Sequence, residues 1–138
     1  MADVTPPVFV DAGDHWDISI AGATVDQCCF DYAVVLRMSV AAGTWELRIE
    51  TPLVLTDGDG AEHLVLPEEA VRLDVVLQVL RLEVAEATAY KDGALALRFG
   101  DGVRIAVAPD EGYEAWGLVG PGGSRLVSLP GGGVAIWS

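Results

Sequence analysis

The sequence predicts an α+β domain, predominantly an antiparallel β-sheet meander with one α-helix. Three observations predict this class. Apolar and polar residues alternate along most of the chain, sixteen glycines and seven prolines supply turns, and a single window has helical spacing. We expect the sheet to curl strongly, into a half-barrel or a two-layer arrangement, because the apolar face of each strand must be covered.

Alternation in the first half of the chain predicts strands over residues 15–22, 29–39, 44–55 and 62–67. The strands at 29–39 and 44–55 should pair as an antiparallel hairpin. Pro52 bends or ends the second of them, because proline has no amide hydrogen to donate. In that second strand Trp45, Leu47 and Ile49 should point inward. In the first strand, one face carries Phe30, Tyr32, Val34, Leu36 and Met38.

One segment, residues 67–82, has the spacing of a helix. Pro67 suits the first helical position, and Glu68 and Glu69 complement the positive end of the helix dipole. The apolar residues that recur at helical spacing are Leu73, Val76, Leu77 and Leu80. The sequence therefore predicts one α-helix near residues 67–82.

From residue 83 the period returns to two. Asp-Gly turns separate three expected strands at 83–90, 94–100 and 103–109, since glycine supplies the positive φ that tight hairpins need. Three more short strands should follow Pro109, with the Pro-Gly-Gly and Pro-Gly-Gly-Gly clusters as turns between them. Trp137, on the last of these, is expected to close the core.

Length and charge limit the classes of function. The 138 residues suit one domain over 1–138, in which residues 1–13 form a flexible arm or an edge strand. A net charge of −13 repels phosphate backbones, so we expect no nucleic-acid partner, while a basic protein would be attracted. The start of the chain has no signal-peptide pattern, and no apolar run is long enough to cross a membrane. With the adjacent thiols of Cys28 and Cys29 read as reduced, this predicts a cytoplasmic protein.

No motif indicates catalysis, a cofactor or a metal. The glycine clusters lack the lysine and helix of a phosphate-binding loop, and no Gly-x-Ser-x-Gly elbow is present. His15 and His63 have no metal-binding spacing, and the acidic neighbours of the two cysteines make them poor nucleophiles. We therefore expect no enzyme, no catalytic residue, no cofactor and no metal site.

Arginines and carboxylates alternate on the outward face of several expected strands. This pattern is typical of cross-strand ion pairs on a wet face, and it also fits a recognition face. Tyr113 and Trp116 should lie on opposite faces of one strand, so that one is in the core and the other is exposed as an interface anchor. The candidate binding residues are Glu46, Arg48, Glu50, Arg98, Tyr113 and Trp116.

A pattern of residues spread over the chain carries a resemblance. It includes Gly22, Val25, Asp26, Gln27, Phe30, Asp31 and Tyr32, then GTWELRIETPLVL, then YEAW followed by GPGG, PGGG and the final AIW. From about Trp16 to Trp137 the chain resembles a family of small actinobacterial proteins of unknown function, common in streptomycetes. The resemblance implies an intracellular, free-standing domain and carries over no catalytic residue.

These observations favour a non-enzymatic protein-interaction module. One form of this hypothesis is an immunity-like or antitoxin-like protein that binds a basic partner, and another is self-association as a homodimer. The alternative is a small-ligand-binding protein or an unassigned enzyme, with its site in the concave face of the curled sheet. Glu46, Arg48, Glu50 and Arg98 would line that site.

Overall fold

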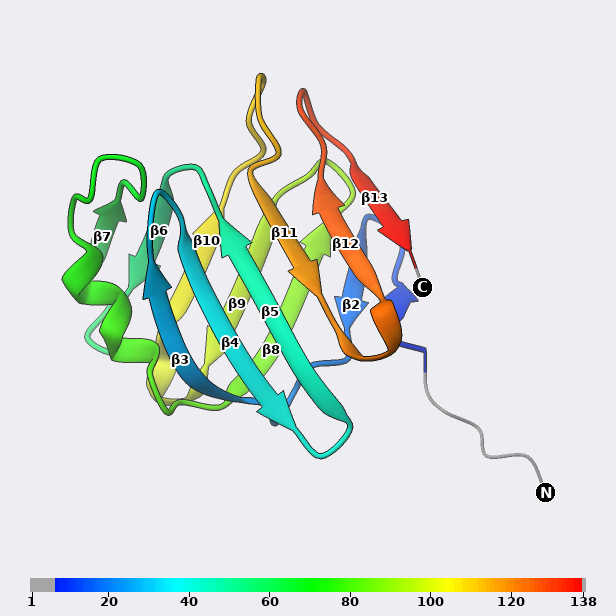
Figure 1. Ribbon diagram of the computed structural model, residues 1–138, viewed down its shortest axis with the longest axis horizontal. Coiled ribbons are helices and arrows are strands. Elements are labelled where there is room, and N and C mark those ends of the chain that lie inside the picture. The colour runs from blue at the N-terminus through cyan, green and yellow to red at the C-terminus, as the bar shows by residue number, and fades with distance from the viewer. Residues whose placement is uncertain (1–6, 138) are drawn as a thin grey trace.

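The computed structural model describes residues 7–137 and shows two antiparallel sheets packed face to face (Figure 1). The seven-stranded sheet contains, in spatial order, β1 (Phe9–Asp11), β2 (His15–Ile18), β8 (Val84–Tyr90), β9 (Leu95–Phe99), β10 (Arg104–Val107), β6 (Leu53–Thr56) and β7 (Glu62–Val65). The six-stranded sheet contains β13 (Val134–Trp137), β12 (Arg125–Ser128), β11 (Trp116–Val119), β5 (Gly43–Ile49), β4 (Val34–Val40) and β3 (Thr24–Phe30). The predominantly antiparallel β-sheet class is confirmed.

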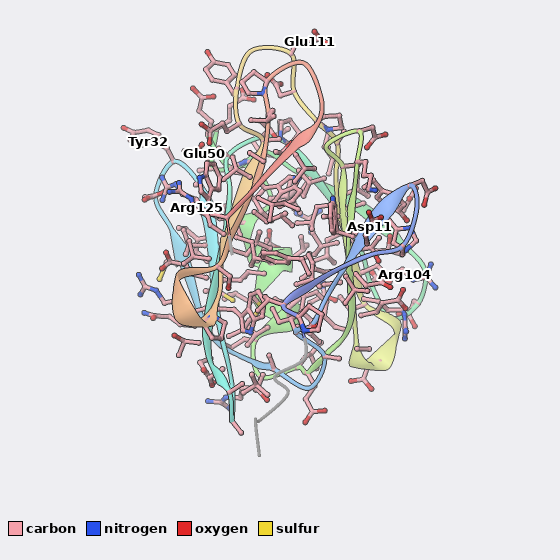
Figure 2. All side chains as sticks on the ribbon, turned by 90° about the vertical axis from the view of Figure 1, so that its right-hand side faces the viewer. Asp11, Tyr32, Glu50, Arg104, Glu111 and Arg125 are labelled. Carbon is pink, nitrogen blue, oxygen red and sulfur yellow. The ribbon has the colours of Figure 1, made fainter. Side chains whose placement is uncertain are left out.

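The strongly curled sheet and the half-barrel are wrong. Each sheet is open, and the core lies between the two layers, as the edge-on view shows (Figure 2). Trp45, Leu47 and Ile49 point inward from β5 as expected, and none is more than 3% exposed. Leu97 and Phe99 of β9 face the same core from the other sheet. Because the apolar faces of two sheets cover each other, neither sheet has to curl onto itself.

Two expected strands are each interrupted by a turn. In 29–39, the carboxylate of Asp31 accepts a hydrogen bond from the Ala33 amide at 2.7 Å, which ends β3 at Phe30 and starts β4 at Val34. Tyr32 therefore projects outward, with 78% of its surface exposed. In 44–55, the chain leaves one sheet after β5 ends at Ile49 and enters the other at β6, so Pro52 lies in the connection just before β6 and ends neither strand. The β4–β5 hairpin itself is confirmed.

The helix expected over 67–82 is instead a 3₁₀ helix, η1, over Leu73–Val79. Ala70 and Arg72 have φ of 56° and 59°, in the left-handed region, which excludes a continuous helix from Pro67. A 3₁₀ helix repeats every three residues, so Val76 and Val79 share the buried face, while Leu77 is 51% exposed. Two shorter 3₁₀ turns are η2 (Gly100–Gly102) and η3 (Pro121–Gly123).

The C-terminal strands follow the expected order, with one correction. β8, β9 and β10 form the three-stranded meander, and β11, β12 and β13 form the three strands after Pro109. Trp137 does not close the core. It is 53% exposed on the edge strand β13, where the Arg125 guanidinium lies 5.6 Å from its ring centre.

The first strand of the described residues forms the edge of the seven-stranded sheet. Of the segment 1–13, residues 1–6 lie outside the described part, and β1 within the remainder is an edge strand that pairs with β2. Between residues 7 and 137, no helix is both long enough and apolar enough to cross a membrane.

Candidate functional site

The expected binding residues do not lie together, because some are on the outer face of one sheet and Arg98 is on the outer face of the other. Glu46, Arg48 and Glu50 are exposed on the outer side of the six-stranded sheet, on β5 and at its end. Arg98 is exposed on β9, in the opposite sheet. Figure 2 shows the separation, with Glu50 on one side of the molecule and Arg104, the register partner of Arg98, on the other. The shared concave site expected for these residues is therefore not formed.

Trp116 and Tyr113 have opposite environments. Trp116 is 1% exposed, and its indole N–H donates to the carbonyl of Gly93 at 2.9 Å. The hydroxyl of Ser128 donates to the same carbonyl at 2.8 Å. Tyr113 is 70% exposed, but it lies in the loop before β11 rather than on the opposite face of that strand. Trp116 thus belongs to the core, and only Tyr113 is available as an anchor.

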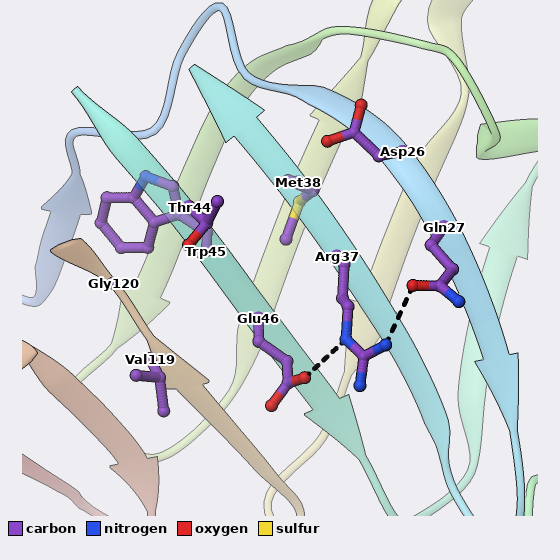
Figure 3. Close-up of a pocket in the computed structure, with 9 residues that line it drawn as sticks. All are labelled: Asp26, Gln27, Arg37, Met38, Thr44, Trp45, Glu46, Val119 and Gly120. Carbon is purple, nitrogen blue, oxygen red and sulfur yellow. Dashed lines mark hydrogen bonds and ion pairs between the residues drawn. The ribbon is translucent and has the colours of Figure 1, made fainter. Parts of the chain in front are cut away.

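Ion pairs cover the outer face of the six-stranded sheet. In the hollow of about 460 Å³ drawn in Figure 3, Arg37 donates to Glu46 and to Gln27, both at 2.9 Å. The hydrogen bond to Glu46 raises the pKa of Arg37 above its ordinary value. Arg48 lies two residues after Glu46 on β5 and donates to Asp31 and to Glu50, both at 3.3 Å. Each of these arginines is therefore already paired with side chains of the same sheet face. This favours the interpretation of the face as solvent-exposed cross-strand ion pairs.

A second hollow, of about 330 Å³, lies at the end of the sandwich where β3, β5 and β7 end (Figure 1, upper end). Its sides include apolar groups of Pro52, Leu66 and Pro67. We call it the acidic hollow, and define it by its two tyrosines and four carboxylates: Tyr32, Tyr113, Glu50, Glu68, Glu69 and Asp110.

Local turns hold the two tyrosines at the rim of the acidic hollow. Tyr32 is presented by the tight turn at Asp31 described above. Tyr113 is presented by Asp110, whose carboxylate accepts the amide hydrogens of Gly112 at 2.9 Å and of Tyr113 at 3.1 Å. The carbonyl of Asp110 also accepts a hydrogen bond from Gly131 at 2.7 Å, which joins this loop to the next. Both aromatic rings are therefore exposed on an ordered backbone.

The charge of the acidic hollow is only partly compensated. No lysine, arginine or histidine lines it. Glu50 shares the guanidinium of Arg48, but Glu68 and Glu69 form no ion pair with any residue in the described part of the chain. Adjacent carboxylates without a cation create a negative potential that attracts a basic group.

Sequence reasoning missed four of the six residues of the acidic hollow, and Asp110 was not singled out at all. Tyr32 was assigned to the apolar face of a strand, and Glu68 and Glu69 to the start of a helix. Asp31, two residues before Ala33, is the signal that could have indicated the turn, because aspartate favours turns in which its side chain accepts a nearby amide.

Two observations concern metal ligands and the cysteine thiols. Within residues 7–137, no three side chains of the His, Cys, Asp and Glu types are placed to hold a metal ion. Burial raises the pKa of the Cys28 thiol, which lowers its thiolate fraction and its reactivity.

Comparison with known proteins gives one match. The sequence model of a family of unknown function (DUF6188) matches residues 16–138. No curated protein and no solved structure matches the chain. The matched range contains both hollows described above and every expected binding residue.

Proposed function

The chain belongs to this family of unknown function, DUF6188, and we propose that it is a non-enzymatic protein-binding module that takes a basic partner at the acidic hollow. One observation carries the proposal. Two exposed tyrosines flank a hollow that four carboxylates and no basic residue line, and Glu68 and Glu69 among these carboxylates form no ion pair with any of residues 7–137.

The chemistry of the acidic hollow matches a lysine or arginine side chain. The free carboxylates of Glu68 and Glu69 would accept its hydrogen bonds, and an ammonium or guanidinium group binds favourably over a tyrosine ring. Exposed tyrosines are also frequent anchors of protein interfaces, since each offers apolar area with little loss of conformational freedom. The net charge of −13 would steer a basic protein toward the module at long range.

The hollow is the centre of the proposed contact rather than all of it. A stable interface buries about 800 Å² on each partner, more than one hollow of this size provides. Further carboxylates lie close by in the sequence, with Asp31, which pairs with Arg48, next to Tyr32 and Glu111 in the same loop as Tyr113. A basic toxin as the partner would make the module immunity-like or antitoxin-like, and a second copy of the chain would make it a homodimer.

The test compares matched variants of the full chain. The double variant Glu68→Gln/Glu69→Gln removes two charges from the hollow, and Tyr113→Ala removes one ring. The control Asp59→Asn/Glu62→Gln removes two charges at the β6–β7 turn, at the opposite end of the sandwich. Each protein is used to capture partners from lysate of its host at low and high salt, and is titrated with a fluorescent lysine-rich peptide.

We expect both hollow variants to lose the captured partner and to bind the peptide at least about tenfold more weakly, because one loses charge-assisted hydrogen bonds and the other loses the contact between the cation and the ring. The control should change peptide affinity less than about threefold, which is the size expected of long-range charge alone. Equal weakening by the control and the hollow variants would refute a specific site. Light scattering identifies the homodimer if wild type is dimeric and Tyr113→Ala is not.

A further inference from the structure

Two arginines stand side by side on the outer face of the seven-stranded sheet. Arg98 of β9 and Arg104 of β10 are partners in register. The amide of Phe99 donates to the carbonyl of Val103 at 2.8 Å, which makes Phe99 and Val103 a hydrogen-bonded pair of the antiparallel ladder. The neighbouring pair, Arg98 and Arg104, is therefore a non-hydrogen-bonded pair. Facing side chains are closest in this type of pair, and like charges placed there repel each other. Two of only eight basic residues in a chain of net charge −13 are thus adjacent.

The charge of this arginine pair is only partly neutralised. Arg98 donates to Glu86 of β8 at 3.0 Å. Arg104 forms no ion pair with any of residues 7–137, and its partner on the other side, Thr56 of β6, is neutral. This distinguishes the pair from Arg37 and Arg48 on the opposite sheet, each of which donates to at least two side chains.

A hollow of about 370 Å³ adjoins the two guanidinium groups. Ala96 and Ala106, which face each other one alternation along the same strands, are among the residues that line it. Their methyl groups are small, so the surface is lower there than at the arginines. The hydroxyl-bearing residues Thr56, Thr88 and Tyr90 also line the hollow and bring further hydrogen-bond donors to it, and the carboxylate of Glu86, which pairs with Arg98, lines it as well.

We propose that this hollow binds an oxyanion group, a phosphate or a carboxylate, between Arg98 and Arg104. A guanidinium presents its N–H donors in a fixed fork that matches the oxygens of either group. An anion between the two arginines would also attract both guanidinium groups and so offset their mutual repulsion. In Figure 2, Arg104 projects from the outer face of its sheet, where a ligand can reach it. This site is independent of the acidic hollow, since it lies on the outer face of one sheet rather than at the end of the sandwich, shares no lining residue with the hollow and takes a ligand of opposite charge.

The test is a nuclear magnetic resonance titration of the ¹⁵N-labelled full chain at constant pH and ionic strength. One arm uses inorganic phosphate and the other uses acetate. We expect the side-chain Nε–H signals of Arg98 and Arg104 to shift and saturate. Saturation by phosphate alone assigns a phosphate ligand, and saturation by acetate alone assigns a carboxylate.

Variants test which side chains bind the anion. Arg104→Ala should weaken binding about tenfold or more, and Arg104→Lys should also weaken it, because lysine keeps the charge but has no fork. Glu86→Gln should strengthen binding several-fold, because it frees Arg98 from its ion pair. Arg37→Ala, an arginine removed from the outer face of the opposite sheet, is the matched control and should leave binding unchanged.

Three results would overturn the proposal. They are the absence of a saturable shift with either anion, unchanged titration curves in Arg104→Ala, and shifts shared equally by Arg37 and Arg48. Misfolding cannot imitate the expected pattern, because Glu86→Gln is expected to gain affinity.

Discussion

Replacing Gly120 by alanine tests how closely β11 approaches the core tryptophan of β5. Gly120 follows β11 and has φ of −119°, which any residue adopts, so the backbone conformation does not resist the change. A Cβ at this position would lie 2.7 Å from Cζ3 and 2.9 Å from Cε3 of Trp45, and 3.0 Å from Oγ of Ser124. Gly120→Ala therefore introduces a steric conflict and little else.

The size of the effect follows from how firmly Trp45 is held. Its side chain is 3% exposed, and its ring packs edge-on against Phe9 with 6.5 Å between ring centres. A buried ring with such neighbours cannot shift by several tenths of an ångström without disturbing them, and overpacking of this kind costs about 1–3 kcal/mol. For a chain of this length, a loss of about 2 kcal/mol lowers Tm by about 6–10 °C.

Gly117→Ala is the matched control. Gly117 lies on β11 itself, and the nearest heavy atom to its new Cβ would be Cγ2 of Val127 at 4.0 Å. An alanine in a strand loses less entropy on folding than a glycine, so this variant should keep or gain up to about 1 kcal/mol. Urea unfolding followed by circular dichroism measures both variants.

The double variant Gly120→Ala/Trp45→Phe identifies the cause of the loss. Phenylalanine has a smaller ring than tryptophan, so Gly120→Ala should cost less in the Trp45→Phe background than in wild type. Equal free energies of unfolding for Gly120→Ala and Gly117→Ala would refute the close contact, and so would a cost that Trp45→Phe leaves unchanged.

Three further predictions concern hydrogen bonding and ionisation. Ser128→Ala should lower the free energy of unfolding in urea by about 0.5–1.5 kcal/mol. The double variant Ser128→Ala/Trp116→Phe should lose more than the sum of the two single losses, because the carbonyl of Gly93 would then have no side-chain donor. Strict additivity of the two losses would contradict this. The hydrogen bond from His63 holds the pKa of Asp57 below its ordinary value, so its contribution to stability is present above about pH 4 and is lost as pH falls through the lowered pKa. Asp57→Asn should therefore flatten the acid limb of Tm against pH, and parallel limbs would exclude this role. Because burial raises the pKa of Cys28, iodoacetamide at pH 8 should modify it more slowly than free cysteine, as mass spectrometry of the peptides would show.

The predictions that succeeded rest on local signals. Alternation over Trp45, Leu47 and Ile49 identified the inward face of β5, and the Asp-Gly turns identified the meander of β8, β9 and β10. A strand face and a two-residue turn are decided by neighbours in the sequence, so both can be recognised without knowing the partner strand.

The candidate sites were predicted less completely. Alternation correctly placed Arg98 and Glu46 outward, but it says nothing about which sheet a strand joins, and these two residues point away from each other across the core. Tyr32 was assigned to a continuous strand because the turn at Asp31 interrupts an otherwise regular alternation. The late start of η1 likewise depends on positive φ at residues such as Arg72. Arginine rarely adopts positive φ, so nothing in the sequence indicated this conformation.

By itself the sequence determined the strongly acidic charge, the alternation that makes a mostly β domain, and the positions of most turns. Only the tertiary structure decided that β5 and β6 belong to different sheets, that Trp137 lies on an exposed edge, and that two tyrosines far apart in the sequence flank one hollow. The physical reason is that strand order depends on contacts between distant segments, such as β11 with β5 and β2 with β8. The free energy of those contacts comes from burying two apolar faces together, and the residues of one face do not indicate which distant segment will cover it.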